Sequence, residues 1–258
     1  MGDEPENAHA LWVFAHPRGD SLNATLRDVG VARLRADGWS VDVADLYAEG
    51  FDPILVDEGG DDVRAEQRRL LAADLVVLQF PLWWYGPPAM LKGWIDRVFE
   101  RGFAYDVPDP ATGRNRKYGD GGLAGRRALA VVTAGDRANS ISPRGISGDV
   151  EDLFWPLLHG TFWYTGMEAL APQLITDVHG IDADGARRLA QELAERLGTV
   201  GTEASVLSFL QPKGTGCDLL RSTRRRRPGD VRPRPVRIPS GHAGDRTPVR
   251  VSDRVPHS

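Results

Sequence analysis

The 258-residue chain has room for one large domain or two small ones, and its composition, 41% hydrophobic and 26% charged, is ordinary for a globular protein. Its single cysteine, Cys217, excludes a disulfide framework and a cysteine-based metal site, which suits a cytoplasmic protein. No apolar run reaches the roughly 20 residues that cross a bilayer, so membrane insertion is not expected. The acidic, polar N-terminus is unlike a signal peptide.

The net charge of −4 combines two unlike parts. Residues 212–258 carry 12 Lys+Arg and 4 Asp+Glu, whereas the preceding residues carry 20 and 32. The last segment is too poor in apolar residues to offset the entropy of ordering it. We therefore expect a flexible N-terminus over 1–9, an ordered domain over 10–200 and a disordered basic tail over 212–258. The arginine run 224–227 has no aromatic neighbours for stacking, so nucleic-acid binding is not expected.

The ordered region alternates apolar runs typical of buried strands with segments of helical period. Strands are predicted over 10–16, 39–46, 74–80, 127–135 and 168–176. Helices are predicted over 22–36, 61–73, 89–101, 148–166 (despite Pro156) and 182–197. Five strands that alternate with five helices predict a doubly wound, five-stranded parallel sheet with helices on both faces.

The carboxyl ends of the strands are where such folds bind ligands, which singles out the loops 16–23, 81–88 and 133–148. The first loop precedes a helix, where free N–H groups and the helix dipole attract an anion such as phosphate. Its polar side chains are His16, Arg18, Asp20, Ser21 and Asn23. It matches neither the dinucleotide fingerprint nor the ATPase P-loop. The alternative is that Asp20 or Ser21 only caps the helix.

The second loop holds three adjacent aromatic residues, Trp83, Trp84 and Tyr85. An aromatic wall at this edge suits a flat heterocycle, although core packing or a subunit interface is the alternative. The third loop, over 133–136, offers small residues and free backbone groups beside such a ring. A flat ring that carries a phosphate fits the three loops together, and this description fits a flavin.

Six stretches within residues 11–197 together resemble one protein family. They are FAHPRGDSLNATL, GWSVDVADLYAEGFDPIL, AEQRRLLAADLVVLQFPLWWYGPPAMLKGWIDRVFERGFAY, RALAVVTAG, GISGDVEDLFWPLLHGTFWYTG and LAPQLI. The chain resembles the NAD(P)H:quinone oxidoreductase family of the DT-diaphorase type, in its bacterial branch. The combination is specific because no single short motif carries it, and it does not include the basic tail.

This resemblance implies a flavodoxin-like fold, a tightly bound FAD (FMN in some branches) and a homodimer with active sites at the dimer interface. It implies ping-pong chemistry, in which NAD(P)H delivers hydride to the flavin and leaves before a quinone binds at the same place. Carried over by position, the cofactor-binding residues are His16, Ser21, Leu22, Asn23, Pro81, Leu82, Trp83, Trp84, Tyr85, Thr133, Ala134 and Gly135. The candidate substrate contacts are Phe103, Tyr105 and Tyr118.

Two departures from the family concern acid–base chemistry and the phosphate loop. The animal quinone reductases carry a tyrosine and a histidine after the third loop, where this chain has Ile141 and Ser147. Neither residue is a general acid near neutral pH, so we assign no catalytic side chain and expect the flavin to carry the reaction. Asp20 stands where the family often has Ser or Thr, and a carboxylate disfavours a nearby phosphate unless it points away.

The leading hypothesis is a cytoplasmic, flavin-dependent NAD(P)H dehydrogenase that reduces quinones and holds no metal. Two other classes stay open: a non-catalytic, flavin-binding regulatory subunit of a potassium efflux system, and a flavodoxin-type electron carrier. The missing tyrosine–histidine pair favours the regulatory subunit. The aromatic loop and the apolar helix over 148–166 favour the enzyme.

Overall fold

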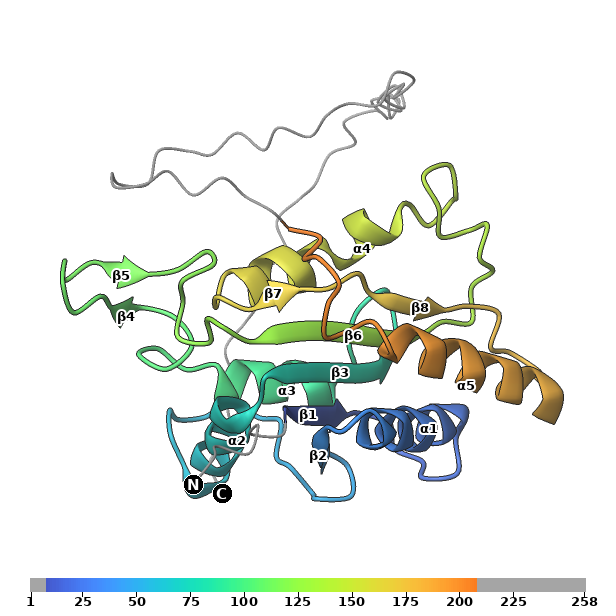
Figure 1. The fold of residues 1–258 in the computed structure, drawn as a ribbon, viewed down its shortest axis with the longest axis horizontal. Coiled ribbons are helices and arrows are strands. Elements are labelled where there is room, and N and C mark those ends of the chain that lie inside the picture. Colours follow the sequence, from blue (N-terminus) through green and yellow to red (C-terminus); the bar gives the residue numbers. More distant parts are fainter. Residues whose placement is uncertain (1–7, 208–258) are drawn as a thin grey trace, which may run out of the picture. The chain divides into compact units, whose positions relative to one another are not determined.

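The computed structural model describes residues 8–207, which form the flavodoxin-like α/β fold that the sequence predicts (Figure 1). The predictions for residues 1–7 and for the basic tail over 212–258 lie outside the described residues. The strands of the main sheet are β1 (His9–Phe14), β2 (Ser40–Asp45), β3 (Leu75–Pro81), β6 (Arg127–Thr133), β7 (Glu168–Ala169) and β8 (Gln173–Ile175). The helices are α1 (Leu22–Ala36), α2 (Asp61–Ala72), α3 (Ala89–Val98), α4 (Val150–Leu157), the π-helix η1 (Leu158–Trp163) and α5 (Ala183–Leu197).

The main sheet is parallel, in the order β2-β1-β3-β6, with both β7 and β8 paired to β6 at its edge (Figure 1). In register, Phe14 of β1 lies beside Gln79 of β3, and Pro81 of β3 lies beside Thr133 of β6. Because the strands are parallel, the chain leaves β1, β3 and β6 at one edge of the sheet. The three loops that the sequence singles out therefore begin side by side.

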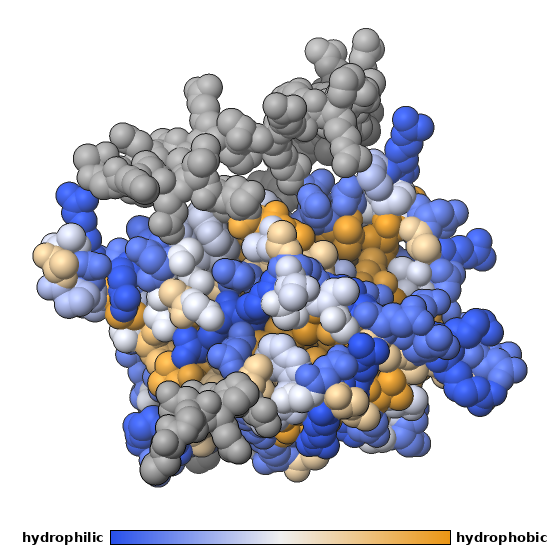
Figure 2. Space-filling model, viewed as in Figure 1, coloured by the Kyte–Doolittle hydropathy of each residue, from blue (hydrophilic) through white to orange (hydrophobic). Residues whose placement is uncertain are grey.

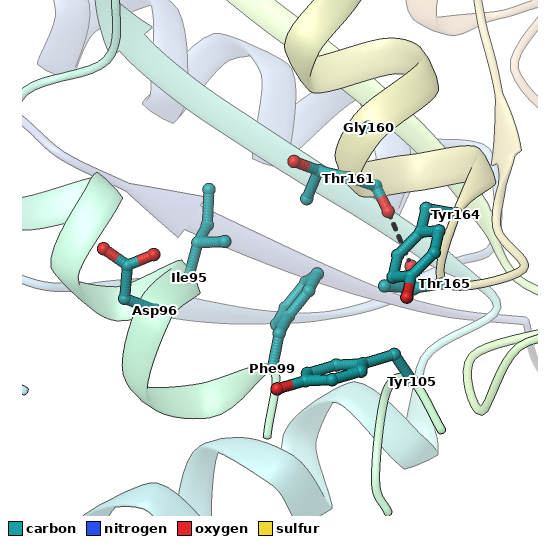
Figure 3. A pocket seen from close by; sticks show the side chains of 8 residues that line it. All are labelled: Ile95, Asp96, Phe99, Tyr105, Gly160, Thr161, Tyr164 and Thr165. Carbon is teal, nitrogen blue, oxygen red and sulfur yellow. Dashed lines mark hydrogen bonds between the residues drawn. The ribbon is translucent and has the colours of Figure 1, made fainter. Parts of the chain in front are cut away.

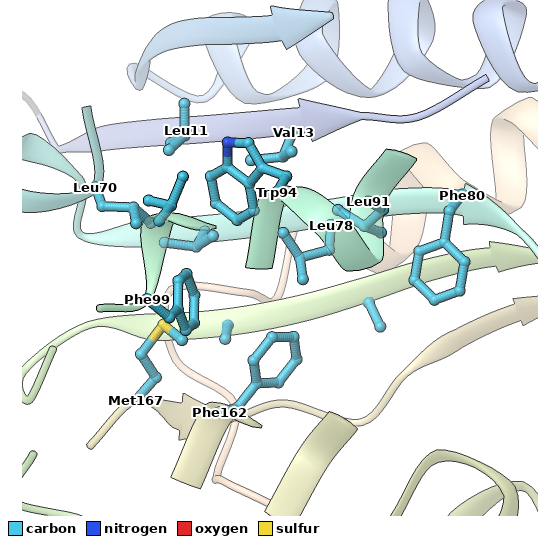
Figure 4. Packing of buried hydrophobic residues seen from close by; sticks show 14 of the residues in the cluster. Leu11, Val13, Leu70, Leu78, Phe80, Leu91, Trp94, Phe99, Phe162 and Met167 are labelled. Carbon is cyan, nitrogen blue, oxygen red and sulfur yellow. The ribbon is translucent and has the colours of Figure 1, made fainter. Parts of the chain in front are cut away.

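Helices cover both faces of the sheet, because alternate side chains of its central strands point to opposite sides. On β1, Leu11 and Val13 pack with residues of α2, α3, α4 and η1, whereas Trp12 and Phe14 pack with residues of α1 and α5. Figure 4 shows the first of these clusters, with Trp94 of α3 among the strand residues. All residues of β3 are buried, which explains why every residue of this strand except Gln79 is apolar.

Apolar side chains at the surface lie mainly on loops. On the face shown in Figure 2, hydrophobic residues form separate patches among hydrophilic ones. The most exposed large apolar side chains include Trp84, Ile146 and Val56, and each belongs to a connection between elements. Within residues 8–207, no helix has the length and apolar character needed to cross a membrane.

The segment predicted as one helix over 148–166 consists of α4 followed by the π-helix η1. Pro156 lies inside α4, where it lacks the N–H of the α-helical ladder and crowds the carbonyl one turn earlier. The ladder widens to the π form two residues later, and such irregularities often mark functional regions. The predicted helix is therefore present at this position, but it is not one regular α-helix.

The predicted fifth strand, 168–176, is divided into β7 and β8. Pro172 lies between them and has no N–H to donate, which confines it to a break or an edge of a sheet. A small antiparallel hairpin, β4 (Val107–Pro108) with β5 (Asn115–Arg116), is absent from the sequence prediction because two-residue strands carry no periodic signal. Neither difference alters the fold class, because the parallel order of the main strands is kept.

A charged network joins β2, α2 and α3. The Arg69 guanidinium donates to Asp42 at 2.7 Å, to Glu66 at 2.8 Å and to Glu49 at 3.0 Å. Glu66 is 5% exposed, and its second carboxylate oxygen accepts from the Trp94 indole N–H at 2.8 Å. The hydrogen bonds from Arg69 hold the pKa of Asp42 below its ordinary value. Glu66 therefore connects the charged network to α3, the helix that follows the aromatic loop.

Replacing Glu66 by alanine removes the acceptor of the Trp94 N–H and one carboxylate partner of Arg69. We expect the free energy of unfolding to fall by about 2–4 kcal/mol, because a buried donor is left unsatisfied. Urea unfolding followed by circular dichroism measures this change. The control, Asp61→Ala, breaks an exposed pair with Arg64 and should cost less than about 1 kcal/mol. Equally small losses in the two variants would contradict the role assigned to Glu66.

Candidate functional site

A cavity of about 320 Å³ lies at the carboxyl edge of the sheet, where the loops after β1, β3, β6 and β8 meet. It is lined by His16, Arg18, Ser21, Leu22, Asn23, Pro81, Leu82, Trp83, Thr133, Gly135, Val178 and His179. Of these, only Arg18, Val178 and His179 are absent from the cofactor-binding set carried over from the family. The fold thus brings most of that set together around one space.

The start of α1 supplies the polar side of the cavity. Ser21 caps the helix: its Oγ accepts from the Ala24 N–H at 3.2 Å and donates to the Arg18 carbonyl at 2.9 Å. The first turn of a helix leaves its N–H groups without partners inside the helix, and Leu22 and Asn23 occupy that turn. Ser21 therefore acts as the cap that one alternative predicted, and it lines the cavity as well.

A buried chain of hydrogen bonds runs beneath the cavity. The Trp12 indole N–H donates to Gln79 Oε1 at 2.8 Å, and Gln79 Nε2 donates to the Asn23 carbonyl at 2.7 Å. Asn23 Nδ2 in turn donates to Thr133 Oγ1 at 2.9 Å. Asn23 Oδ1 is buried and has no hydrogen-bond partner among residues 8–207. Since buried polar atoms are nearly always paired, Asn23 presents an acceptor that a ligand in this cavity would satisfy.

The aromatic loop contributes less to the cavity than the sequence analysis expects. Trp83 lines it, with its ring centroid 6.3 Å from that of His16. Trp84 is fully exposed and Tyr85 is 53% exposed, and neither lines the cavity. Of the three rings, only that of Trp83 therefore forms part of the cavity wall in this structure.

A tight turn over Trp83–Gly86 accounts for this arrangement. Trp83 and Gly86 exchange two backbone hydrogen bonds of 3.0 Å, and the intervening Trp84 and Tyr85 have φ of 51° and 59°. Two successive left-handed residues form the hairpin turn that asparagine and glycine usually occupy. For bulky side chains this conformation costs about 1–3 kcal/mol each, and such strain is concentrated at functional sites.

The third loop is tied to its neighbours on both sides. Ala134 is buried and does not line the cavity, and its N–H donates to the Ile175 carbonyl of β8 at 2.8 Å. Asp136 Oδ2 accepts from the Tyr85 hydroxyl at 3.1 Å and from the Ser147 hydroxyl at 3.0 Å. The two hydroxyl oxygens lie 2.9 Å apart. The loop after β6 is thus bonded to β8 and to the aromatic loop.

The loop after β8 supplies two lining residues that the sequence analysis does not assign to the site, Val178 and His179. A Cβ on Gly135 would lie 2.0 Å from His179 Nε2, so the imidazole occupies space that only glycine leaves free. The sequence contains a signal for this loop, since the fifth predicted strand ends at the same edge as the others. His179 carried no recognisable motif, and only the packing against Gly135 identifies it.

The candidate substrate residues lie elsewhere. None of Phe103, Tyr105 and Tyr118 lines the carboxyl-edge cavity. Tyr105 lines a second cavity, of about 220 Å³, between α3 and η1 (Figure 3). The ring centroids of Tyr118 and Tyr164 lie 5.0 Å apart, and burial raises the pKa of the Tyr164 phenol. Phe103 packs against the hydrophobic core. These residues therefore lie apart from the lining of the first cavity.

The lining of the carboxyl-edge cavity combines two kinds of groups. The side chains of His16, Arg18 and His179, with the first-turn N–H groups of α1, suit a phosphate. Leu82 and Trp83 present apolar and aromatic surface that suits a flat ring. Within residues 8–207, no three His, Cys, Asp or Glu side chains are grouped to hold a metal ion. The donor set and the unpaired acceptor of Asn23 therefore fit a phosphorylated heterocycle such as a flavin.

Comparison with known proteins agrees with this geometry. A family described as having a flavodoxin-like fold matches residues 8–197. The human ribosyldihydronicotinamide dehydrogenase [quinone] is 33% identical over 222 residues, which cover 76% of this chain and 93% of that protein. The rat NAD(P)H dehydrogenase [quinone] 1 is 33% identical and covers 76% of this chain and 78% of that protein. A solved structure from Klebsiella pneumoniae, provisionally named a quinone reductase, is 35% identical with a TM-score of 0.73 and covers 78% and 87% of the two chains.

Replacing Gly135 by alanine tests the assignment of His179 to the cavity. The added methyl group forces the imidazole aside, and because the displaced atoms are the end of a side chain, the fold should survive. We expect FAD binding, followed by fluorescence titration, to weaken about tenfold or more, with a melting temperature close to that of the unmodified protein. Gly19→Ala is the matched control, since a Cβ there meets no atom within 4 Å. If the two variants bind FAD equally well, His179 has no role in the site.

Proposed function

The chain belongs to the flavodoxin-like NAD(P)H:quinone oxidoreductase family, and from this premise we propose that it is a flavin-dependent enzyme that transfers hydride from NAD(P)H to quinones. The observation that carries the proposal is the meeting of three predicted loops at one cavity with both phosphate-binding and ring-binding groups. The relatives named as quinone dehydrogenases are similar over most of the described domain. Both the family relationship and the lining of the cavity therefore support the proposal that the protein is an enzyme.

We assign the residues of the cavity to two roles. The first turn of α1 and the side chains of His16, Arg18 and His179 hold the phosphate, since helix N-termini, imidazole N–H donors and the Arg18 guanidinium favour anions. Leu82 and Trp83 hold the ring, and Asn23 Oδ1 accepts a hydrogen bond from the cofactor. These contacts orient the cofactor before either substrate binds.

A bound flavin supplies the hydride chemistry, and a ping-pong order follows if the nicotinamide and the quinone use the same place in turn. The surrounding side chains orient the substrates and limit the access of water. Ile141 is 7% exposed and apolar, and the Ser147 hydroxyl is no acid near neutral pH. Neither of these residues therefore supplies the proton that completes the hydroquinone, which leaves water or Tyr118 as its source.

We further propose FAD rather than FMN as the cofactor and a homodimer as the active form. The dimer is supported by the position of Phe103, Tyr105 and Tyr118, which lie apart from the cavity of their own chain. In the dimer this aromatic region would border the partner's cavity and contact its substrates. The cytoplasmic location expected from the single cysteine stays a prediction.

The purified protein, reconstituted with FAD or FMN, tests the proposed function. We expect it to be yellow, with flavin absorption near roughly 450 nm that is lost on anaerobic addition of NADH or NADPH and restored by a quinone. Rapid-scanning absorbance with each nicotinamide also shows which one the enzyme prefers. A holoprotein that binds flavin but is reduced by none of NADH, NADPH and ribosyldihydronicotinamide, the donor in the name of the human relative, would contradict the enzyme and favour the regulatory subunit.

Arg18→Ala tests the phosphate assignment. Loss of the guanidinium should weaken the binding of FMN and FAD about three- to tenfold and leave riboflavin, which lacks phosphate, unchanged. Isothermal titration of the flavin-free protein with each ligand gives the three dissociation constants. A matched control is Arg64→Ala on α2, outside the cavity lining. An equal loss for riboflavin and FMN would show that Arg18 does not act on the phosphate.

A further inference from the structure

Three side chains, Tyr85, Asp136 and Ser147, connect the loops that follow β3 and β6 beside the cavity; we call them the Tyr85 cluster. Their polar atoms lie 2.9 to 3.1 Å apart in all three pairs. An ionised Asp136 accepts from both hydroxyl groups, and hydrogen bonds to a charged group are about twice as strong as neutral ones. The cluster therefore joins two loops that are far apart in the sequence by strong hydrogen bonds.

The turn over Trp83–Gly86 needs such a link. Its two central residues are held in the left-handed region, which bulky side chains adopt only when their surroundings require it. Trp84 is fully exposed and cannot supply that support. The Tyr85 hydroxyl reaches another loop, where it donates to Asp136 and lies 2.9 Å from the Ser147 hydroxyl oxygen. Among the described residues of the turn, Tyr85 is thus the one whose side-chain hydrogen bonds oppose the unfavourable backbone conformation.

The partners of Tyr85 are themselves held in place. Ile141 and Gly148 form a bridge that closes the loop after β6, and the Ser147 N–H donates to the Ser140 carbonyl at 2.9 Å. Asp136 follows Gly135, which lines the cavity. Ser147 occupies one of the two positions where the family resemblance implies an acid–base side chain. In this chain that position instead provides a hydrogen-bond partner for the aromatic loop.

We propose that Tyr85 is a positioning residue of the quinone reductase: through Asp136 and Ser147 it holds the left-handed turn closed and keeps Trp83 against the cofactor cavity. This inference rests on the proposed function for its effect on flavin, but the hydrogen-bonded turn itself does not depend on that function. Tyr85 acts through Trp83, so its removal changes the cavity wall without removing any group that lines the cavity.

The test is Tyr85→Phe, which deletes one hydroxyl and keeps the ring. Hydrogen exchange measured by mass spectrometry should show faster exchange in peptides over 81–88 and 136–148, with or without flavin, because the turn opens more often. FAD binding should weaken about three- to tenfold, as expected for the loss of one hydrogen bond to a charged acceptor. The visible circular dichroism of the bound flavin should change, since it reports the surroundings of the ring.

Matched variants separate the hydrogen bonds from charge and from general damage. Asp136→Asn keeps an acceptor oxygen but loses the charge, so it should weaken FAD binding less than Asp136→Ala does. Asp136→Ala removes the contacts to both hydroxyl groups and should weaken FAD binding at least as much as Tyr85→Phe. The double variant Tyr85→Phe/Asp136→Ala should be no worse than Asp136→Ala alone, because Asp136→Ala already removes the contact between these two side chains. Tyr47→Phe, on the loop after β2, controls for loss of a phenol outside the cavity lining and should change none of these quantities.

The outcomes distinguish this inference from the proposed function. Unchanged exchange over 81–88 in Tyr85→Phe overturns the positioning role whether or not the protein binds flavin. The positioning role is also overturned if the losses of FAD affinity add in the double variant, or if Asp136→Asn loses as much FAD affinity as Asp136→Ala. If the unmodified protein binds no flavin, the proposed function fails, and the exchange measurement alone still decides whether Tyr85 holds the turn.

Discussion

The hydrogen-bonded chain from Trp12 through Gln79 and Asn23 to Thr133 is the interaction on which the site depends. It crosses from β1 to β3, then to the first turn of α1 and to the last residue of β6. Gln79 is fully buried, so each of its hydrogen bonds forms where water cannot compete, and an unmade bond there would be costly. These hydrogen bonds thereby set the position of α1 relative to the ends of β3 and β6. The cavity lies where the helix and the strand ends meet.

The helix, strands and loops around these hydrogen bonds supply different chemical groups to the cavity. A helix start supplies N–H groups toward an anion, and the apolar strand end and Trp83 supply a surface for a ring. The apolar strands beneath are buried on both faces, so they provide a rigid support for loops that are polar and partly exposed. A parallel sheet gives this arrangement readily, because every strand delivers its following loop to one edge. The same fold can therefore carry different chemistries, and the lining residues decide which.

Two irregular features lie outside this regular frame, and each has a local cause. The π-helix η1 follows Pro156, which interrupts the α-helical ladder. The left-handed turn over Trp83–Gly86 places bulky residues where glycine is usual, and hydrogen bonds from another loop hold it. Both features border cavities, the first beside Tyr105 and the second beside Trp83. Backbone strain near a cavity is common in proteins, because the surrounding contacts can be selected to maintain it.

The hydrophobic period of the sequence predicted the order of strands and helices and placed the candidate site at the carboxyl edge, because hydrophobic period and strand ends are local properties of the chain. The family resemblance supplied most of the residues that line the cavity. The roles of His179, Trp84 and Tyr85 were decided by the tertiary structure. His179 reaches the cavity because Gly135 leaves space for it, and Tyr85 turns away from the cavity to bond Asp136 and Ser147. These outcomes rest on contacts between residues distant in sequence, which no local pattern encodes.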